Sequence, residues 1–441
     1  MKNSKILGYG MGSLGKDFAL GVISSYLLVF YTDVLGITAA AAGFILVVTK
    51  IWDAINDPIM GSIVDRTNSK WGRFRPYILL VPIPLAVFSV LCFVAPDFST
   101  SGKFIYALVT YTITGMLFTA YDVPLWGMLP SITENDNDKN KCISIGRFFT
   151  SLAMLLATSF ALPLIHKLGG GTEVANLKVG YPKFMIIIGV ISVVFALITF
   201  ISTKEKPIVE NKVKSENIFK EFIGVLNKPL LTVFIAMTLQ GIVLVLPNVV
   251  GAYYVIYYIG RPDLISLYFL TCGGFGLLAP VVASISLKKI SAKKLTIIAM
   301  LGGIIVSLIA YFVPSNNITL LFAMFAIFGL FSAMPMVTIT SMLMETGEYI
   351  ARVKGRRADG VIFSLNSFAI KCGTAVASGI SSVVLTVTHY NPGAFEQAAS
   401  VGVGLNATRT LIVAGLYLLV ILVVSQFKIP KSEKIENEVV I

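Results

Sequence analysis

The chain has 441 residues, of which 56% are hydrophobic and only 13% are charged, and its formal net charge is +12. Soluble domains carry charge on about a quarter of their residues, so this composition excludes a soluble globular protein and indicates several membrane crossings. The positive charge does not indicate nucleic-acid binding, because the lysines and arginines lie in short loops between hydrophobic segments, where membrane topology accounts for them. The four cysteines are far apart without metal-binding spacing, so we expect them to be packing residues.

Twelve apolar segments are each long enough to cross the hydrocarbon core of a bilayer, which takes about 20 helical residues. In chain order the predicted spans are 6–34, 39–64, 77–96, 103–130, 145–166, 181–202, 229–258, 264–287, 295–313, 318–344, 358–388 and 406–427. The sequence therefore predicts an all-α membrane protein with twelve transmembrane helices. We do not expect the first span to be a signal peptide, because Lys16 and Asp17 interrupt it and it has no small-residue cleavage site.

Basic residues predict the orientation of these spans. Most of the 35 lysines and arginines lie in loops on the side that also holds both chain ends. Because positively charged loops stay in the cytoplasm, we expect both termini to be cytoplasmic and the protein to lie in the cell membrane. Few basic residues are assigned to the opposite surface, Arg409 among them. Asp33 and Asp65 lie near loops and are expected to be solvated.

The longest polar stretch, residues 203–228, separates six predicted spans from six. We interpret it as a cytoplasmic linker between two six-helix bundles, residues 1–202 and 229–427, with a cytoplasmic tail at 428–441. The sequence thus predicts two helical domains of similar size.

A short internal repeat favours two related halves. Residues 57–64, Asp-Pro-Ile-Met-Gly-Ser-Ile-Val, resemble residues 279–286, Ala-Pro-Val-Val-Ala-Ser-Ile-Ser, and a basic turn follows each. Two repeated halves around a site at the membrane midplane are the layout of many secondary transporters. Asp57 has no acidic counterpart at Ala279, so we assign any cation site to the N-terminal half alone.

The second predicted span carries charged residues on one face. Lys50, Asp53, Asn56 and Asp57 recur at i, i+3, i+6 and i+7, which places them on the same side of a helix. A charge at the bilayer centre costs at least about 2.5–3.5 kcal/mol, so two carboxylates there indicate ion ligands that face a wet cavity. The structural alternative, pairing with Lys50, satisfies only one of the two carboxylates. We therefore expect this helix to bind a monovalent cation, with Asp53 and Asp57 as its charged ligands.

The fourth span offers groups that suit a carbohydrate. Thr119, Asp122 and Trp126 share a helix face, and Pro124 removes a backbone hydrogen bond between them. A carboxylate that accepts hydroxyls beside an aromatic ring that stacks on a sugar face is a usual way to hold a glycoside. The alternative for Trp126 alone is an anchor at the membrane interface.

Four further ionisable residues lie within predicted spans: Lys16, Asp17, Arg147 and Lys371. Ionisable groups inside a membrane usually mark a substrate or ion pathway. The alternative for Lys16 and Arg147, which lie nearer the span ends, is structural pairing or extension of the side chain to the interface.

Five stretches carry a family resemblance: Lys16-Asp17, Phe30-Tyr-Thr-Asp-Val-Leu-Gly36, Ile51-Trp-Asp-Ala-Ile-Asn-Asp-Pro-Ile-Met-Gly61, Asp65-Arg-Thr-Asn-Ser-Lys-Trp-Gly-Arg-Phe-Arg-Pro76 and Arg357-Ala-Asp-Gly-Val-Ile-Phe-Ser-Leu-Asn-Ser-Phe-Ala-Ile-Lys371. Together they resemble the glycoside–pentoside–hexuronide:cation symporter family, with the closest likeness to melibiose permeases. The resemblance implies a major facilitator fold of two six-helix domains, which agrees with the spans and linker above.

The resemblance also implies roles for individual residues. The positions that form the Na⁺, Li⁺ or H⁺ site in melibiose permeases match Asp53, Asn56, Asp57 and Thr119. Those that bind the galactoside match Lys16, Asp17, Asp122, Trp126 and Arg147, and the one that joins the two halves near the site matches Lys371. The presence of both Asp17 and Asp122 favours a neutral glycoside as the substrate. One difference from the family pattern is Phe118, because the resemblance implies a tyrosine at that position.

The sequence thus predicts a secondary active transporter, not an enzyme, that imports a melibiose-like galactoside with Na⁺, Li⁺ or H⁺. We expect it to act as a monomer with no cofactor besides the coupling cation. Basic residues at the cytoplasmic ends of the spans, Arg66, Arg73 and Arg357, are predicted to form gate ion pairs. The alternatives are symport of a β-glycoside, pentoside or glucuronide, a carrier of amphipathic lipids, and a membrane-embedded enzyme.

Overall fold

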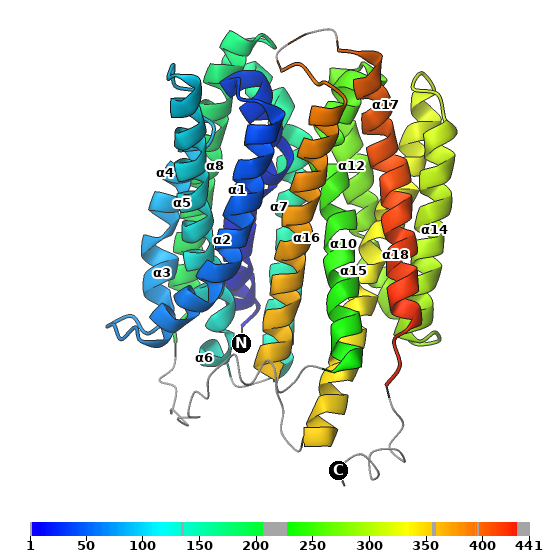
Figure 1. Ribbon diagram of the computed structural model, residues 1–441. Helices are drawn as coiled ribbons and strands as arrows, with labels where there is room; N and C mark the ends of the chain where they lie inside the picture. Colours follow the sequence, from blue (N-terminus) through cyan, green and yellow to red (C-terminus); the bar gives the residue numbers. More distant parts are fainter. Residues whose placement is uncertain are drawn as a thin grey trace. The chain divides into compact units, whose positions relative to one another are not determined.

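The computed structural model describes residues 2–133, 136–205, 227–354, 359–392, 394 and 397–429. Helices joined by loops make up this part of the chain, and no β-strand forms there (Figure 1). Eleven of the described helices are long and apolar enough to cross a membrane. Helices form because lipid offers no partner for a backbone N–H or C=O, so each must be satisfied within its own segment. The predicted all-α membrane protein is confirmed.

The third predicted span, residues 77–96, is not one continuous helix. It consists of α3 (Arg75–Leu80) and α4 (Pro82–Leu91), and only α4 counts as an apolar helix, a shorter one than the eleven. Pro82 has no N–H to donate to the preceding turn, so the helix is interrupted at Val81.

Internal contacts divide the chain into two compact units. The first comprises Met1–Glu210, Asn248–Leu270 and Ser378–Leu405, and the second Asn211–Pro247, Thr271–Ala377 and Asn406–Ile441. Most of the predicted linker, residues 203–228, lies outside the described residues, as does most of the tail, 428–441. The division into residues 1–202 and 229–427 therefore stays a prediction.

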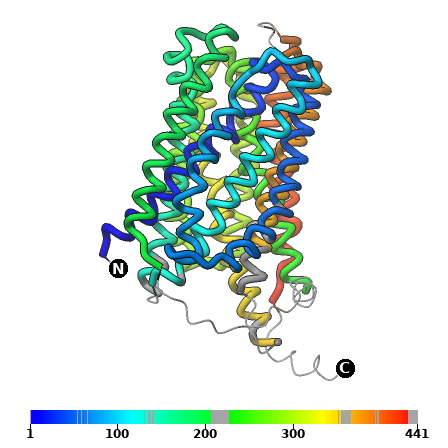
Figure 2. The backbone as a smooth tube through the Cα atoms, turned by 90° about the vertical axis from the view of Figure 1, so that its left-hand side faces the viewer, coloured from blue at the N-terminus to red at the C-terminus, as the bar shows by residue number. Residues whose placement is uncertain are grey.

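The first unit contains the N-terminal helices. They are α1 (Asn3–Val29), η1 (Phe30–Leu35), α2 (Ala39–Asp65), α3, α4, α5 (Thr100–Gly127), α6 (Leu129–Ile132), α7 (Asp136–Gly169) and α8 (Val174–Ser202), together with α11 (Gly251–Tyr253), η2 (Tyr254–Ile259) and η3 (Pro262–Leu264). α1 packs along α7 and α8, and α2 packs along α5; these are the blue to green helices of Figures 1 and 2.

The second unit contains most of α10 (Lys228–Val249), all of α13 (Ala279–Ser286), α14 (Ala292–Phe312), α15 (Ile318–Lys354), η4 (Thr408–Ile412) and α18 (Val413–Ser425). Within it α14 packs against α15 and α18. Three further helices, α12 (Ile265–Gly276), α16 (Asp359–Val387) and α17 (Ala399–Ala407), contribute residues to both units.

A repeated local structure supports the internal repeat. η1 and η2 are both short π-helices, and each ends at a glycine with a left-handed backbone, Gly36 with φ of 79° and Gly260 with φ of 72°. Glycine suits both positions because a side chain strains a backbone with positive φ. The same irregular turn thus closes the corresponding span of each half.

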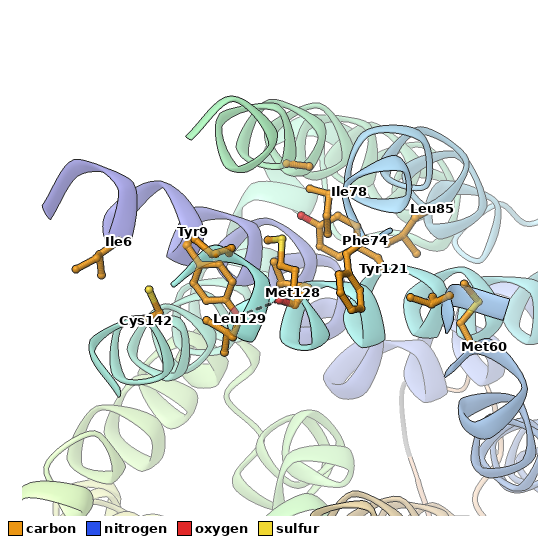
Figure 3. Packing of buried hydrophobic residues seen from close by; sticks show 14 residues of the cluster. Ile6, Tyr9, Met60, Phe74, Ile78, Leu85, Tyr121, Met128, Leu129 and Cys142 are labelled. Carbon is orange, nitrogen blue, oxygen red and sulfur yellow. Dashed lines mark hydrogen bonds between the residues drawn. The ribbon is translucent and has the colours of Figure 1, made fainter. Parts of the chain in front are cut away.

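Buried apolar residues hold the end of α5 in place (Figure 3). Tyr9 on α1 donates its hydroxyl hydrogen to the backbone oxygen of Leu125 at 3.0 Å, and its ring meets Trp126 edge to face, with 6.3 Å between ring centres. Met128 is fully buried in the same cluster. This packing fixes the turn of α5 that carries Asp122 and Trp126.

Asp33 is not solvated as expected. Its half-buried carboxylate accepts hydrogen bonds from Tyr390, from Tyr257 at 3.0 Å and from Thr32 at 2.6 Å, and Thr32 also meets the Tyr253 hydroxyl at 2.7 Å. Burial raises the pKa of the Tyr390 hydroxyl, so this group stays neutral and can donate. Tyrosines from distant parts of the sequence thus hold residues 248–270 and 378–405 on the end of the first predicted span, an arrangement that sequence spacing does not reveal.

Arg409 is a second departure from the expected arrangement. The charge pattern predicts Arg409 at the outer surface, but in the structure it is only 1% exposed within the second unit. Its guanidinium carbon lies 4.1 Å from the ring centre of Phe328 and 4.9 Å from that of Phe325, and Nη2 lies 3.7 Å from Sγ of Cys272. An arginine buried against aromatic rings contributes packing as well as charge.

We expect Arg409→Ala to lower the apparent melting temperature of the purified protein in detergent. Truncating a large buried side chain costs about 2–5 kcal/mol, because the site collapses only partly. Arg261→Ala is the matched control, since Arg261 pairs with Asp263 at 2.7 Å but its side chain is 51% exposed, and exposed pairs contribute little. If both variants lower the apparent melting temperature by the same amount, burial of Arg409 does not contribute to stability.

Candidate functional site

α2 and α5 run in the same direction and stay in register over two turns. Three residue pairs join them: Thr49 with Thr112, Asp53 with Gly115, and Asp57 with Thr119. The sequence separation between the partners is nearly constant, 63 in the first pair and 62 in the last. Both carboxylates of α2 therefore face α5, one helical turn apart.

Asp53 is a buried carboxylate with one oxygen satisfied and one not. Its Oδ2 accepts a hydrogen bond from Nζ of Lys50 at 2.9 Å, and that ammonium also lies 5.6 Å from the ring centre of Tyr111. Its Oδ1 is buried without a hydrogen-bond partner in the described part of the chain, and so is Nδ2 of the neighbouring Asn56. A buried charged oxygen without a partner is costly until a donor or a cation meets it.

Gly115 makes the position of Asp53 possible. A Cβ built on this glycine overlaps Oδ1 of Asp53, so any other residue at this position displaces the carboxylate. Glycine here permits close approach of a charged side chain to a helix backbone. Sequence reasoning missed this residue, because a glycine within an apolar run gives no signal of its own.

Asp57 completes the cation-binding face predicted for α2. It is half-buried, and Thr119 of α5 donates its hydroxyl hydrogen to Oδ1 of Asp57 at 3.0 Å. No group of three or more His, Cys, Asp or Glu able to hold a metal occurs among the described residues. Two carboxylates, an amide and a hydroxyl offer hard oxygen ligands, which suit an alkali cation or a proton better than a transition metal.

A second charged cluster joins α1 to α5. Nζ of Lys16 lies 2.7 Å from Oδ1 of Asp17 and 2.9 Å from Oδ1 of Asp122. The side chains of Lys16 and Asp17 are 4% and 1% exposed, whereas that of Asp122 is 32% exposed. One ammonium thus bridges two carboxylates, of which only Asp122 is substantially accessible.

Trp126 and Arg147 lie next to this cluster. Nε1 of Trp126 donates to Oδ1 of Asp122 at 3.0 Å, and the guanidinium carbon of Arg147 lies 5.0 Å from a Trp126 ring centre. An indole held at one edge by a carboxylate and at one face by a guanidinium has a fixed orientation. α5 therefore presents Trp126 as part of the charged cluster, which argues against the alternative of an isolated interfacial anchor.

Two neighbours of Lys16 and Asp17 were not assigned from the sequence. Thr150 of α7 donates its hydroxyl hydrogen to Oδ2 of Asp17 at 2.6 Å. The ring of Phe118 lies 5.0 Å from Nζ of Lys16. Thr150 follows Arg147 by three residues, so its place on the same helix face is the signal that identifies it.

The predicted gate residues are only partly described. Arg66 is exposed, and Nε of Arg73 donates to the backbone oxygen of Val64 at 3.2 Å. Arg357 lies outside the described residues, so the gate stays a prediction. Lys371 lies on α16 within the second unit, and its predicted role at the site also stays a prediction.

A residue of the predicted linker, Glu205, holds the basic loop that contains Arg73. The carboxylate of Glu205 accepts the backbone N–H groups of Arg73, Phe74 and Arg75 at 2.8, 2.9 and 2.7 Å. These groups precede or begin α3, where N–H groups have no partner within the helix, so Glu205 acts as a cap. The loop is thereby bonded to a residue three positions beyond the end of α8.

The described helices define a class by fold, the helical membrane proteins with a major facilitator fold. A solved structure with this arrangement, a D-xylose-proton symporter, matches 97% of this chain and 98% of its own with a TM-score of 0.68. Sequence identity is only 16%, so this likeness concerns the fold alone.

Sequence comparison then identifies the family. The model of the MFS/sugar transport protein family matches residues 8–431, and the chain belongs to this family. The symporter YnaJ of Bacillus subtilis (strain 168), whose name describes it as uncharacterized, is 33% identical over 97% of this chain and 92% of its own. The isoprimeverose transporter of Lactiplantibacillus pentosus is 30% identical over 88% of this chain and 81% of its own.

These relatives confirm the family resemblance that the sequence motifs indicated. They are transporters, so the protein is a multi-pass membrane transporter and not an enzyme. The names of the relatives do not single out melibiose permeases, so that part of the resemblance stays a prediction.

Proposed function

We propose that the protein imports a neutral glycoside together with one monovalent cation, Na⁺, Li⁺ or H⁺. The observation that carries the proposal is the buried Oδ1 of Asp53, which has no partner among the described residues. A cation beside Asp53 supplies the missing interaction, and Asn56, Asp57 and Thr119 lie on the same two helices to share it. The cation then offsets the cost of carboxylates held inside the membrane.

The sugar is proposed to bind at the cluster around Asp122. The Asp122 carboxylate is accessible enough to accept sugar hydroxyls, and the fixed indole of Trp126 offers an apolar surface. Lys16 and Arg147 balance the charges of Asp17 and Asp122, so the cluster carries no net charge for an ionised substrate to neutralise. This balance favours a neutral glycoside over a glucuronide, and a melibiose-like galactoside is our first candidate.

Coupling between cation and sugar is proposed to run through α5. Thr119 contacts the cation-binding residue Asp57, and Asp122 lies three residues further along the same helix. A cation that draws Asp57 and Thr119 together therefore sets the position of the turn that presents Asp122. Such coupling is reciprocal, and about 1–3 kcal/mol of it raises the affinity of each ligand about 5–150-fold when the other is bound.

Alternating access is proposed to occur between the bundles of residues 1–202 and 229–427, with the linker at 203–228 joining them. Lys371 is proposed to bring the C-terminal bundle to the sugar, and Arg66, Arg73 and Arg357 to pair with acidic residues when the cytoplasmic side is closed. Both termini are proposed to lie in the cytoplasm, and the monomer is proposed to be the transporting unit in the cell membrane.

Uptake of radiolabelled melibiose into right-side-out membrane vesicles tests the function. We expect an imposed Na⁺, Li⁺ or proton gradient to drive accumulation, and an ionophore that collapses the gradient to stop it. Isoprimeverose, a β-glycoside and a glucuronide belong in the same panel, because the family includes a transporter named for isoprimeverose. Accumulation of a glucuronide alone would contradict the proposal of a neutral substrate. If no sugar accumulates with any of the three cations, symport of glycosides is contradicted.

A further inference from the structure

Gln240 is a buried amide of the second unit with one end satisfied and the other not. It lies on α10 and is 2% exposed. Its Nε2 donates a hydrogen bond to the backbone oxygen of Ser332 on α15 at 2.6 Å, whereas Oε1 is buried without a hydrogen-bond partner in the described part of the chain. A carbonyl oxygen only accepts, so turning the amide around places two acceptors against each other. The contact with Ser332 therefore fixes Oε1 as an acceptor that no described donor meets.

An amide oxygen in this position differs from a buried hydroxyl. The hydroxyl of Ser307 on α14 is also buried without a partner among the described residues, but a serine hydroxyl on a helix can rotate to a carbonyl of the preceding turn. The two ends of an amide move together, so Oε1 of Gln240 cannot turn to a donor while Nε2 bonds to Ser332. A buried acceptor without a donor is costly, and such a group marks the place of a ligand or of a water molecule.

Gln240 occupies the same position in its half as Lys16 does in the first half. Lys16 lies 20 residues before Gly36, the left-handed glycine that ends η1. Gln240 lies 20 residues before Gly260, the left-handed glycine that ends η2. The repeated turn thus aligns the two side chains on the first span of each half. They are buried to a similar degree, since the Lys16 side chain is 4% exposed.

The partners of the two side chains also correspond. Lys16 bonds to Asp122, which lies on α5 two residues before the proline inside that helix. Gln240 bonds to Ser332, which lies on α15 three residues before the proline inside that helix. α5 and α15 contain the fourth predicted span of each half. In each half the first span thus donates a hydrogen bond to the same part of the fourth, and the second half does so with a neutral amide in place of an ammonium.

We propose that Gln240 is a further binding residue for the transported glycoside, and that its Oε1 accepts one hydroxyl of the sugar. The inference rests on the function proposed above. A sugar hydroxyl supplies the donor that Oε1 lacks. An ionised carboxylate has only lone pairs to offer, so it meets Oε1 as a second acceptor and is disfavoured. Gln240 therefore selects a neutral, hydroxyl-rich ligand without carrying a charge itself.

Gln240→Met is expected to weaken binding of the parent glycoside by about tenfold. Methionine keeps the unbranched shape of the side chain but offers only a weak acceptor, so the sugar hydroxyl loses its partner. In the native protein one deoxy analogue of the glycoside is expected to bind about tenfold more weakly than the parent. In Gln240→Met the analogue and the parent are expected to bind equally well, because the group that bonds to the missing hydroxyl is gone.

Two variants control for position and for chemistry. Thr238→Val changes the same helix, but the Thr238 hydroxyl bonds to the backbone of that helix, Phe234 O at 3.0 Å. Asn406→Leu removes an amide of the same kind, whose Nδ2 donates to the backbone oxygen of Tyr311 at 3.3 Å and whose Oδ1 is buried without a described partner. Asn406 begins the last predicted span of its half, and the last span of the first half contains no proposed sugar ligand. Both variants are expected to leave sugar affinity unchanged.

The experiment is equilibrium binding of melibiose, isoprimeverose and their monodeoxy analogues to the purified native protein and its variants. Thermal unfolding without sugar reports whether each variant is folded. If Gln240→Met does not fold, Gln240→Asn replaces it in the comparison, because this variant keeps an amide but withdraws the acceptor by one methylene group. The same loss of affinity and the same loss of the deoxy penalty are expected.

The outcomes separate this inference from the proposed function. If Gln240→Met keeps the native affinity and the native deoxy penalty, Oε1 bonds to a buried water molecule and the inference is wrong, while the proposed function stands. An equal loss of affinity in Asn406→Leu shows that buried amides act through the stability of the fold, and this result also rejects Gln240 as a ligand. If the native protein binds none of the sugars, the proposed function fails and the inference fails with it.

Discussion

Asp57→Cys is expected to abolish cation-driven accumulation of glycoside, leaving at most equilibration of the sugar across the membrane. The substitution removes one of the two carboxylates that face α5 and leaves the Thr119 hydroxyl without its charged acceptor. A charged ligand that contributes at least about 1.4 kcal/mol to cation binding accounts for a tenfold difference in affinity, so its loss is expected to weaken cation binding by about tenfold or more. Uptake in vesicles at a series of Na⁺, Li⁺ and proton gradients measures the effect.

The control for Asp57 is a carboxylate that lies outside the two carboxylates of α2 that face α5. Asp97 is 92% exposed and pairs with Lys178 at 3.4 Å, so Asp97→Cys is expected to leave uptake and its cation dependence intact. If Asp57→Cys still accumulates glycoside fully in response to a cation gradient, Asp57 is not part of the site that couples the cation to the sugar.

Gly115→Ala is expected to weaken cation coupling strongly although it changes no charge. The added methyl group occupies the space of Oδ1 of Asp53, so the carboxylate has to leave its buried position or α2 and α5 have to separate. Overpacking of this kind costs about 1–3 kcal/mol, which corresponds to roughly a 5–150-fold loss of apparent cation affinity. The measurement is the cation concentration that gives half-maximal glycoside uptake.

Gly61→Ala is the matched control for Gly115→Ala. Gly61 lies on α2 itself, and a Cβ at this position meets no atom within 4 Å. Its cation dependence is expected to match the native protein. Unchanged apparent cation affinity in Gly115→Ala would mean that the buried position of Asp53 is not the one used to bind the cation.

The helical architecture was predictable because the backbone N–H and C=O groups of a segment in lipid have no water to bond to. Each apolar run of about 20 residues has to satisfy its own backbone, and spacing of i+3, i+4 and i+7 then sets which residues share a face. Asp53 and Asp57 were assigned to one face in this way, and the structure places both against α5. The interruption at Pro82 was also visible in the sequence as a residue without an N–H, but the predicted third span ran through it.

Contacts between distant segments were not predictable in the same way. Asp33 lies near a loop in the sequence, and nothing local indicates that Tyr257 and Tyr390 bond to its carboxylate. Arg409 lies near a predicted span end, and only the packing of Phe325 and Phe328 shows that it is buried. In both cases the partners are more than 80 residues away, so helical periodicity carries no information about them.

The sequence by itself determined the class of protein, the positions of most of its spans and the helix faces that carry ionisable groups, because these follow from local periodicity and the cost of charge in lipid. Only the tertiary structure decided how those groups are satisfied. In the structure Gly115 lies against Asp53. Lys16 and Thr150 donate hydrogen bonds to the two oxygens of Asp17, whereas Asp122 stays accessible. The physical reason is that a helix face fixes the direction of a side chain, whereas its hydrogen-bond partners depend on which other helix packs against that face.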